Sequence, residues 1–364
     1  MTEWKKVKLG DILVVKKGDY ITKKEAREGI YPVILGGREP AYYIDKYNHT
    51  GKAIVVSRSG ASAGYVSFWD EPIFVTDGFL IEPNNATTFE FLYYSLKSKQ
   101  QHLHRSQKGA AIPHVTPSLI CDIDVYLPDL ATQHRIAEVL SRYDSLIENY
   151  HRQIKLLEEA AQRLYKEWFV DLRFPGHETT KIVDGVPEGW EKRTLDEFCN
   201  VFTGKKNANQ GIHNGKYKFF TCGEIPLSID SYLYDGPAII ISGNGSYTGR
   251  TMFYEGKFDL YQRTYACTIK DPIYDYLIYG LYEIVKSGLT SKISGGTHGA
   301  AIPYIVMSDI TKFDFLYNEK LLKSFSSRLK KFLSITMIYS EQIRHLSEAR
   351  DRLLPKLMNG EIEV

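Results

Sequence analysis

The feature that most constrains this chain is an internal duplication: its two halves repeat one another at a spacing of 185 to 190 residues. In both halves a variable globular segment precedes a long segment with heptad patterning. Four matches occur in the same order along the two halves: Trp4 with Trp190, 51–60 with 236–245, 109–115 with 299–305, and 153–160 with 342–349. The period is far too long for a solenoid. The chain therefore contains two equivalent units.

Composition sets the outer bounds. With 364 residues and 43% hydrophobic content, the chain can bury true cores in two or three domains. No apolar stretch approaches the ~20 residues that span a bilayer, and the start of the chain lacks the apolar segment of a signal peptide, so we expect a cytoplasmic protein without membrane contact. The four cysteines show no CxxC spacing, which favours free thiols.

The globular part of each half is expected to mix strands and helices. β-branched and aromatic residues cluster between glycine turns, which predicts strands at 53–57, 65–69, 238–242 and 265–269. Apolar spacing of three to four residues predicts helices at 89–99 and 274–286. Both halves are therefore expected to be α+β units of similar size. The Pro and Gly content of 174–189 is typical of a linker.

The heptad segments give the clearest structural signal. Their stripes follow the same register at a constant offset of 189 residues, and only Thr336 and Arg350 interrupt the second one. A stripe with a 3.5-residue period is a coiled-coil seam, and each helix would run about 50 Å. The stripes consist of Ile136, Leu140, Tyr143, Ile147, Tyr150, Ile154, Leu157, Ala161, Leu164 and Trp168 in the first half, and of Phe325, Leu329, Phe332, Thr336, Tyr339, Ile343, Leu346, Arg350, Leu353 and Leu357 in the second.

Two interpretations of these stripes compete. Each helix could pack only on its own globular unit, which is the simpler reading for an isolated helix. Two equal stripes in one chain instead favour two long antiparallel coiled-coil helices, related by pseudo-twofold symmetry, with Tyr150 and Tyr339 near their middle. Such helices would act as a ruler between two recognition surfaces. Thr132 is expected to cap the first helix, and Pro355 to kink or end the second.

A search for catalytic chemistry finds only weak candidates. The segment 244–251 lacks the first glycine and the lysine of a phosphate-binding loop and is interpreted as a glycine turn. The tetrapeptide 271–274 lacks the second proline of an amino-methyltransferase motif and is interpreted as a loop entering a helix. We expect 255–257, which resembles the end of a nuclease signature, to be a turn, while His102 and His104 have no neighbouring metal ligands. A non-enzyme without metal is favoured.

Three contiguous motifs reveal a family resemblance. The segments 127–137 (LPDLATQHRIA), 168–177 (WFVDLRFPGH) and 352–362 (RLLPKLMNGEI) resemble the conserved regions of type I restriction-modification specificity subunits. The resemblance implies two target-recognition domains, each reading one half of a bipartite double-stranded DNA sequence, held apart by helices that dock methyltransferase subunits. Two such subunits are expected, with restriction/translocase subunits as further partners. It also implies that S-adenosylmethionine, ATP and Mg²⁺ serve only the partner subunits, with no cofactor in this chain.

The resemblance and the repeat together define an expected domain order. It places a first target-recognition domain at 1–130, a central long helix at 131–170, a linker at 171–189, a second target-recognition domain at 190–320 and a C-terminal long helix at 321–364.

DNA contacts are predicted from turns that combine glycine with Arg, Lys, Asn or Ser, because these bring backbone close to phosphate and present donors to base edges. Arg58 and Arg250 rank first, since each lies in or beside the repeated glycine turn and Arg can pair bidentately with guanine. The candidates are Lys16, Lys17, Lys23, Lys24, Arg38, Arg58, Ser59 and Lys108 in the first half, and Lys205, Lys206, Asn207, Asn209, Asn244, Arg250 and His298 in the second.

Two alternatives remain from other classes. A net charge of +2 and a pI of 8.1 argue against a protein that coats nucleic acid by charge alone, and mildly favour a protein-binding scaffold or adaptor without sequence-specific DNA recognition. A fused methyltransferase-nuclease is disfavoured by the absent cofactor motif and the modest length. Salt sensitivity of DNA binding separates a DNA reader from an adaptor, because phosphate contacts weaken steeply as salt rises.

Overall fold

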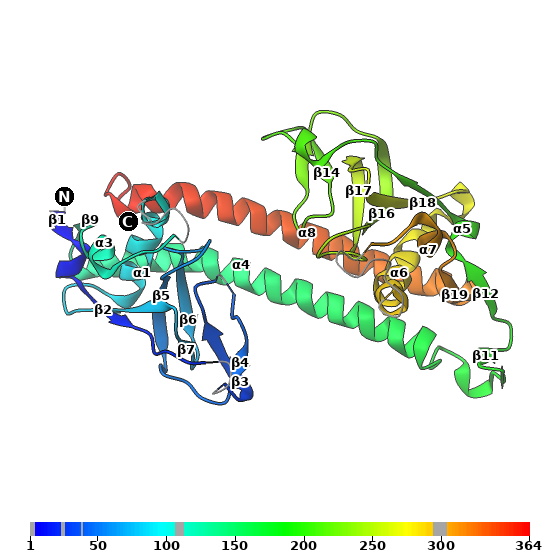
Figure 1. Ribbon diagram of the computed structural model, residues 1–364, viewed down its shortest axis with the longest axis horizontal. Helices are drawn as coiled ribbons and strands as arrows, with labels where there is room; N and C mark the ends of the chain where they lie inside the picture. Colours follow the sequence, from blue (N-terminus) through cyan, green and yellow to red (C-terminus); the bar gives the residue numbers. More distant parts are fainter. Residues whose placement is uncertain (1–3, 23–25, 38, 106–112, 294–303) are drawn as a thin grey trace. The chain divides into compact units, whose positions relative to one another are not determined.

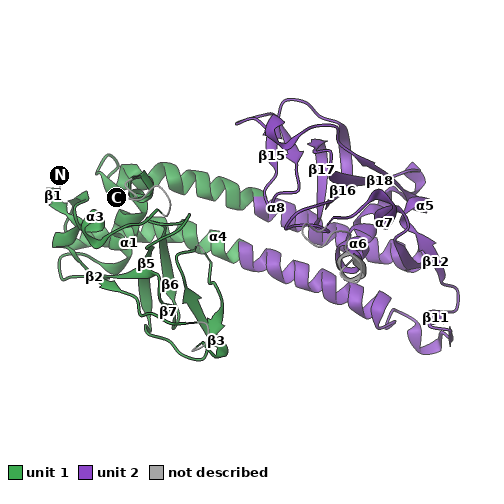
Figure 2. Cartoon of the chain, viewed as in Figure 1, with its two compact units in different colours: residues 1–150, 341–364 green, residues 151–340 purple. Residues whose placement is uncertain are grey.

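A computed structural model describes residues 4–22, 26–37, 39–105, 113–293 and 304–364 of the chain. It divides into two compact units (Figure 2). Unit 1 comprises residues 1–150 and 341–364, and unit 2 comprises residues 151–340. Each unit thus contains one globular part and one portion of each long helix.

Unit 1 is built around an antiparallel four-stranded sheet and a smaller three-stranded sheet. The central strand β5 is buried from Ala53 onward, which explains its uninterrupted apolar run. The larger sheet has the order β2 (Leu13–Lys17), β8 (Gly78–Pro83), β5 (Lys52–Ser57), β6 (Val66–Asp70), and the smaller one the order β4 (Tyr43–Ile44), β3 (Glu28–Ile34), β7 (Phe74–Val75).

Short helices complete the core of unit 1. Helix α1 (Phe89–Ser98) is capped by Thr88, whose hydroxyl accepts from the Phe91 amide at 3.3 Å. Its residues Leu92 and Leu96 are fully buried against the sheet residues Ile54 and Val56. The other elements here are η1 (Leu9–Asp11), α2 (Gln100–Arg105) and α3 (Pro117–Cys121), and β1 (Lys5–Lys8) paired antiparallel with β9 (Asp124–Leu127).

Unit 2 contains one larger sheet of six strands (Figure 1). Helix α6 (Ile278–Ile293) packs on strands β16 and β17, and the core joins Ile239 and Ile241 to Leu281 and Val285. The strand order is β13 (Cys199–Thr203), β18 (Thr264–Ile269), β16 (Tyr234–Ser242), β17 (Thr251–Leu260), β14 (Tyr217–Phe220), β15 (Leu227–Ile229). The remaining elements are η3 (His177–Thr179), β10 (Ile182–Val183), β11 (Val186–Pro187), β12 (Glu191–Thr194) paired with β19 (Asp314–Tyr317), α5 (Leu195–Phe198), η4 (Ala208–Gln210), η5 (Pro272–Leu277) and α7 (Met307–Thr311).

The duplication inferred from sequence is confirmed in the order of elements. The strand pair β1·β9 of unit 1 corresponds to β12·β19 of unit 2, and the hairpin β5·β6 corresponds to β16·β17. Helices α1 and α6 follow the sheets at equivalent places. All four predicted strands and the helix at 89–99 are confirmed. The prediction of a helix at 274–286 is partly wrong, because its first turn is the 3₁₀ segment η5 and the α-helix begins at Ile278.

The two long helices α4 (Leu130–Tyr165) and α8 (Glu319–Met358) each cross from one unit into the other. They run antiparallel inside unit 1, where Arg135 donates to the Val364 carbonyl at 2.7 Å and Asp144 pairs with Arg350 at 2.6 Å. They also run antiparallel inside unit 2, where Trp168, just beyond α4, lies against Phe325 near the start of α8. A π-helical turn, η2 (Lys166–Val170), extends α4 and buries Trp168.

The cap predicted for the first long helix is wrong. Asp129, not Thr132, caps α4, because its carboxylate accepts from the Thr132 amide at 2.9 Å and from the Thr132 hydroxyl at 3.0 Å. Thr132 is thereby the third helical residue rather than the cap. Of the two outcomes predicted for Pro355, the end of the helix is wrong, because α8 continues to Met358 and its last turn tolerates the missing amide of the proline, whereas a kink stays a prediction.

Candidate nucleic-acid interface and helix seam

In unit 1 the glycine turn between β5 and β6 meets the segment that follows the Gly-Ala-Ala-Ile-Pro motif. The turn is closed by the Gly64 amide, which donates to the Ser57 carbonyl at 2.8 Å. Its Gly60 and Gly64 have φ values of +82° and +79°, which side chains rarely adopt. The Gly60 amide donates to the Pro113 carbonyl at 3.1 Å, and the Val115 amide donates to the Arg58 carbonyl at 2.9 Å. Two motifs far apart in sequence are thus joined.

Two further loops of unit 1 reach the same turn. The Arg58 amide donates to the Asp77 carbonyl at 3.1 Å, and the Ser59 hydroxyl donates to the Asp77 carboxylate. The Ser57 hydroxyl donates to the Gly37 carbonyl at 3.3 Å. These bonds tie the backbone of Arg58 on both sides while its side chain stays exposed. The guanidinium is therefore presented to solvent from a firmly held backbone.

Unit 2 repeats this arrangement with different residues. The Gly249 amide donates to the Ser242 carbonyl at 2.8 Å, as the Gly64 amide does in unit 1. The Ile305 amide donates to the Gly243 carbonyl at 2.9 Å, and Asn244 forms a β-bridge with Tyr304. The turn after the central sheet strand and the segment after the second Gly-Ala-Ala-Ile-Pro motif therefore lie together in both units.

The two top-ranked arginines lie at opposite ends of their turns: Arg250 is the last residue before β17, whereas Arg58 is the first residue after β5. At the repeat offset, Arg58 corresponds to Gly243 and Arg250 corresponds to Tyr65. The Arg250 guanidinium donates to the Glu224 carbonyl at 2.5 Å and lies 5.5 Å from the centre of the Tyr247 ring. The Tyr247 hydroxyl donates to the Glu224 carboxylate at 3.1 Å, which raises the pKa of Tyr247. Arg250 is thus held in place by its neighbours, and its side chain is half-buried.

The predicted lysines of β2 differ in their surroundings. Lys16 forms an exposed ion pair with Glu82, at 2.6 Å. Lys17 is the last residue of β2. The amide of the next residue, Gly18, donates to the Gly78 carbonyl at 3.0 Å, which places Lys17 near Gly78. Since Gly78 follows Asp77, Lys17 lies at the edge of the sheet that carries the Arg58 turn.

In the second predicted cluster, Lys206 has a structural partner. Its ammonium lies 2.8 Å from a carboxylate oxygen of Asp259, whose side chain is only 4% exposed. The Asn207 side-chain oxygen accepts from Gln262 at 3.1 Å, while Lys205 and Asn209 are exposed. The cluster therefore combines one lysine that compensates a buried charge with exposed residues that are available to a ligand.

Five of the predicted DNA contacts lie outside the described residues: Lys23, Lys24, Arg38, Lys108 and His298.

Four residues at the two turns were not selected from sequence. His114 and Tyr304 occupy matching positions directly after the Gly-Ala-Ala-Ile-Pro motif, and the repeat itself is the signal that could have identified them. The Asp77 carboxylate accepts a hydrogen bond from the Ser59 hydroxyl, and the Tyr247 ring packs against the Arg250 guanidinium. Asp77 lies outside the motifs, and Tyr247 lies in the glycine turn but is not one of the residue types selected there, so only the fold reveals their roles.

The segments that resembled catalytic motifs are accounted for by the fold. Residues 244–249 form the glycine turn after β16, and Asp271 caps η5 by accepting from the Ile273 amide at 3.1 Å, as expected of a loop entering a helix. The turn expected at 255–257 is wrong: these residues lie inside β17, where Gly256 pairs with Gly236. Within the described residues, no three His, Cys, Asp or Glu side chains gather so that they could hold a metal ion, and no helix is long and apolar enough to cross a membrane.

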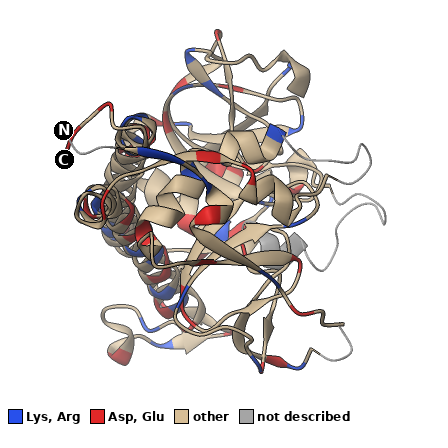
Figure 3. Cartoon of the chain, turned by 90° about the vertical axis from the view of Figure 1, so that its left-hand side faces the viewer, with Lys and Arg blue, Asp and Glu red and all other residues tan. Residues whose placement is uncertain are grey.

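The predicted seam residues all lie at positions with reduced exposure on α4 and α8. Ile136, Leu140, Phe325 and Leu329 are buried, and the others are half-buried: Tyr143, Ile147, Tyr150, Ile154, Leu157, Leu164, Phe332, Tyr339, Ile343, Leu346 and Leu353. Basic and acidic residues are interspersed along these helices (Figure 3), and some form exposed ion pairs, such as Arg142–Glu138 and Arg344–Glu348. The exposed charges on these helices are therefore of both signs.

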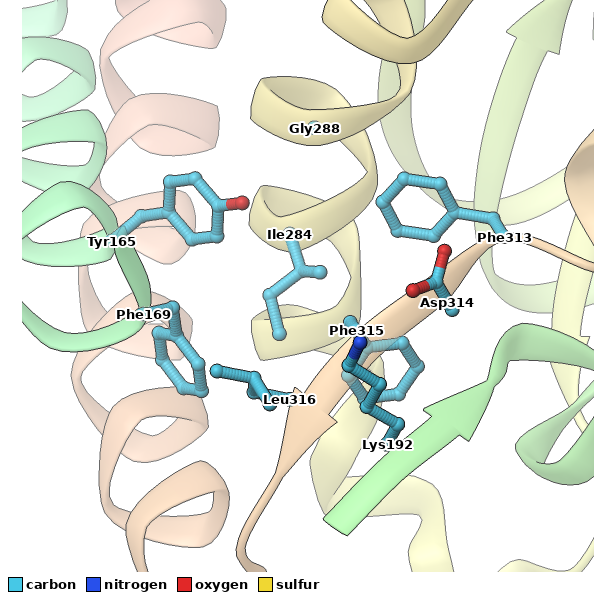
Figure 4. Close-up of a pocket in the computed structure, with 9 residues that line it drawn as sticks. All are labelled: Tyr165, Phe169, Lys192, Ile284, Gly288, Phe313, Asp314, Phe315 and Leu316. Carbon is cyan, nitrogen blue, oxygen red and sulfur yellow. The ribbon is translucent and has the colours of Figure 1, made fainter. Parts of the chain in front are cut away.

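Each unit has a hollow beside its portion of the long helices. One hollow in unit 2 has a volume of about 250 Å³ and lies between Tyr165, Phe169, Phe313 and Leu316, with Gly288 of α6 on its wall (Figure 4). A hollow of about 150 Å³ in unit 1 is lined by residues at equivalent repeat positions, including Lys99, Tyr126 and Met358. At the 189-residue offset, Lys99 corresponds to Gly288 and Met358 to Phe169. The two hollows are thus counterparts in the repeat.

Comparison with known proteins agrees with this architecture. The model of the type I restriction modification DNA specificity domain matches residues 1–159 and 187–316. The MjaIX specificity subunit of a type I restriction enzyme from Methanocaldococcus jannaschii is 27% identical over 86% of this chain and 78% of its own length. The HindI specificity subunit from Haemophilus influenzae is 30% identical, covering 80% of this chain and 82% of its own length.

A solved structure has the same fold. The type I restriction-modification S subunit from M. genitalium superimposes with a TM-score of 0.66 at 20% identity, covering 98% of this chain and 96% of the other. The chain therefore belongs to the family of type I restriction-modification DNA specificity subunits. Recognition of a DNA target is the role of this family, and it agrees with the paired turns described above.

Proposed function

We propose that each unit reads one half of a bipartite DNA target through its glycine turn. The observation that carries the proposal is the repeated convergence of this turn with the segment after the Gly-Ala-Ala-Ile-Pro motif, through the amide of Val115 in unit 1 and of Ile305 in unit 2. The turn carries polar side chains on a backbone that hydrogen bonds hold in place, which suits phosphate and base-edge contacts. Two such surfaces in one chain match two half-sites.

In this proposal the long helices set the distance between the half-sites and dock two methyltransferase subunits. The repeated hollows beside α4 and α8 support the docking of two copies of one partner, because each unit offers an equivalent surface. Restriction/translocase subunits would be further partners. The chain itself would be non-catalytic and cytoplasmic. S-adenosylmethionine, ATP and Mg²⁺ would be used only by the partner subunits.

A selection experiment tests the DNA-reading part of this function. The chain is co-purified with its methyltransferase partner and incubated with a random duplex DNA library, and the retained DNA is sequenced at moderate and at higher salt. We expect a split motif with a fixed gap, and retention that falls with salt because phosphate contacts release counterions. Retention without any motif, or without dependence on salt, would instead support a protein-binding scaffold.

The docking part has its own measurement. Native mass spectrometry of the co-purified complex should give two methyltransferase subunits for each copy of this chain. One bound copy would show that the two hollows are not equivalent docking surfaces.

A further inference from the structure

The seam between α4 and α8 contains an ion pair inside unit 1, formed by Asp144 and Arg350. Arg350 of α8 lies 2.6 Å from Asp144 of α4, and the two side chains are 21% and 30% exposed. The second oxygen of the Asp144 carboxylate accepts from the Tyr94 hydroxyl at 2.7 Å. Both oxygens of this carboxylate are therefore satisfied within unit 1, and Arg350 is largely withdrawn from water.

The corresponding pair in unit 2 is apolar. At the 189-residue offset, Arg350 corresponds to Ala161 and Asp144 corresponds to Leu333. Ala161 is 5% exposed in the core of unit 2, and Leu333 packs against that core. The two units therefore differ at both positions of this pair: both residues are charged in unit 1, and both are apolar in unit 2.

This asymmetry matters for the pairings that two similar helices allow. Because the stripes of α4 and α8 share one register, α8 could also pair antiparallel with α8 of a second copy, and α4 with α4. In the same register, Arg350 would then face Leu333 of the second copy, and Asp144 would face Ala161. Arg350 would then keep only its neighbour Asp351, whose side chain is largely exposed, and Asp144 would keep only the Tyr94 hydroxyl, so each would lose its ion pair across the seam. Polar residues in a seam specify partners in this way, at some cost in stability.

We propose that Asp144 and Arg350 are a pairing-selectivity device: they restrict α4 and α8 to each other and reject like-with-like pairing with a second copy of this chain. The ion pair across the seam forms only when an α4 packs against an α8, whereas in a like-with-like pair Arg350 faces Leu333 and Asp144 faces Ala161. The proposal is independent of the DNA-reading function, since it concerns only the helix seam.

The test removes both charges from the full-length chain. In the variant D144N/R350M the amide oxygen still accepts from Tyr94, and methionine fills the space of the arginine stem. A second variant, Y94F/D144L/R350A, copies the residues of unit 2 at both seam positions and removes the hydroxyl that would lose its acceptor. Unlabelled and ¹⁵N-labelled chains are mixed while unfolded, refolded together and treated with a short amine cross-linker.

The informative cross-link joins Lys356 of one chain to Lys330 of another. Within one α8 these residues are 26 positions apart, about 39 Å along the helix, which exceeds the reach of a short reagent. In a like-with-like pair they approach one another, because residue 356 then faces position 327 of the second copy. Cross-links between light and heavy peptides therefore report like-with-like pairing, and light scattering gives the dimer fraction.

We expect the wild-type chain to give few such cross-links, and each variant to increase the like-with-like dimer fraction on the order of tenfold or more. The control variant E341A/R344A removes one acid and one arginine from an exposed pair on α8 and should behave as the wild type. Variants that refold without additional light–heavy cross-links, or a wild type that forms them as readily as the variants, would overturn the proposal.

Discussion

The ammonium of Lys206 lies 2.8 Å from the carboxylate of Asp259, a buried group that also accepts from the Ser231 hydroxyl at 2.9 Å. Lys206 ranks among the sequence candidates for DNA contact, yet its charge compensates a carboxylate that has almost no access to water. Loss of one partner of such a pair leaves the other charge uncompensated.

We therefore predict that Lys206→Met lowers the free energy of unfolding by about 2 kcal/mol. This is less than the loss of a fully buried ion pair costs, because the lysine side chain is partly exposed to solvent. Lys205→Met, at the adjacent exposed position, should change it by less than about 0.5 kcal/mol. Urea unfolding of the two variants makes the comparison. A Lys206→Met chain of wild-type stability that loses the motif of one half-site would show that Lys206 contacts DNA instead.

Arg58 should govern one half-site only. Its backbone is fixed by Asp77 and Val115 while its side chain is exposed, so we predict that Arg58→Ala relaxes base preference in one half of the motif by about 1–3 kcal/mol. Sequencing of DNA selected by the complex measures the preference at each position. The exposed Arg142 on α4 provides the control, and Arg142→Ala should leave both half-motifs intact. An unchanged motif with a folded Arg58→Ala chain excludes Arg58 as a base reader.

Burial of Glu283 predicts a pH dependence of stability. The side chain lies on α6 and is 2% exposed, and burial raises the pKa of Glu283 although the Ser287 hydroxyl donates to it at 2.8 Å. The folded chain therefore keeps this proton at pH values where the unfolded chain has lost it. Stability from this group is present at low pH and falls as the pH rises from the ordinary glutamate pKa through the raised one.

Glu283→Gln should consequently be more stable than the wild type at pH 8, with the difference closing near pH 4. Thermal or urea unfolding across this pH range measures it. The exposed Glu138→Gln serves as the control, for which we expect little difference at either pH. A Glu283→Gln chain that is less stable at pH 8 would show that the carboxylate makes a net favourable interaction in its charged form.

The aromatic cluster where α8 meets the end of α4 should dominate the stability of unit 2. Phe325 is fully buried, with ring centres 6.0 Å from Trp168 and 5.0 Å from Phe169. We predict that Phe325→Ala lowers the free energy of unfolding by about 3–5 kcal/mol, through lost burial and the cavity that remains. Leu156→Ala is the matched control, because Leu156 is 57% exposed on α4. Equal effects in urea unfolding would contradict the packing described for the cluster.

Periodicity made most of the fold predictable. The strand around Ala53 and the helix beginning at Phe89 follow from local patterns that agree with their burial. The cap of α4 was misplaced, because Asp129 and Thr132 are both good capping residues and only the geometry separates them. The expected turn at Gly256 failed because a glycine at positive φ can also lie within a paired strand.

The candidate site was only partly accessible from sequence. The repeat marked the turns that contain Ser59 and Asn244, but a list of residue types cannot show which loops meet. The contribution of Asp77 depends on a strand order that no local pattern encodes. Nor could composition show that Lys206 compensates a buried acid whereas Arg58 is presented to solvent.

The most direct test of the account changes the length of both long helices together. One heptad is inserted after Tyr150 in α4 and one after Tyr339 in α8, positions that correspond in the repeat and preserve the seam register. Each insertion adds about 10 Å, which equals about three base pairs of DNA. DNA selected by the complex should then contain the same two half-motifs with a gap about three base pairs longer. The same gap as in the wild type, with both half-motifs retained, would contradict the claim that the helices set the spacing.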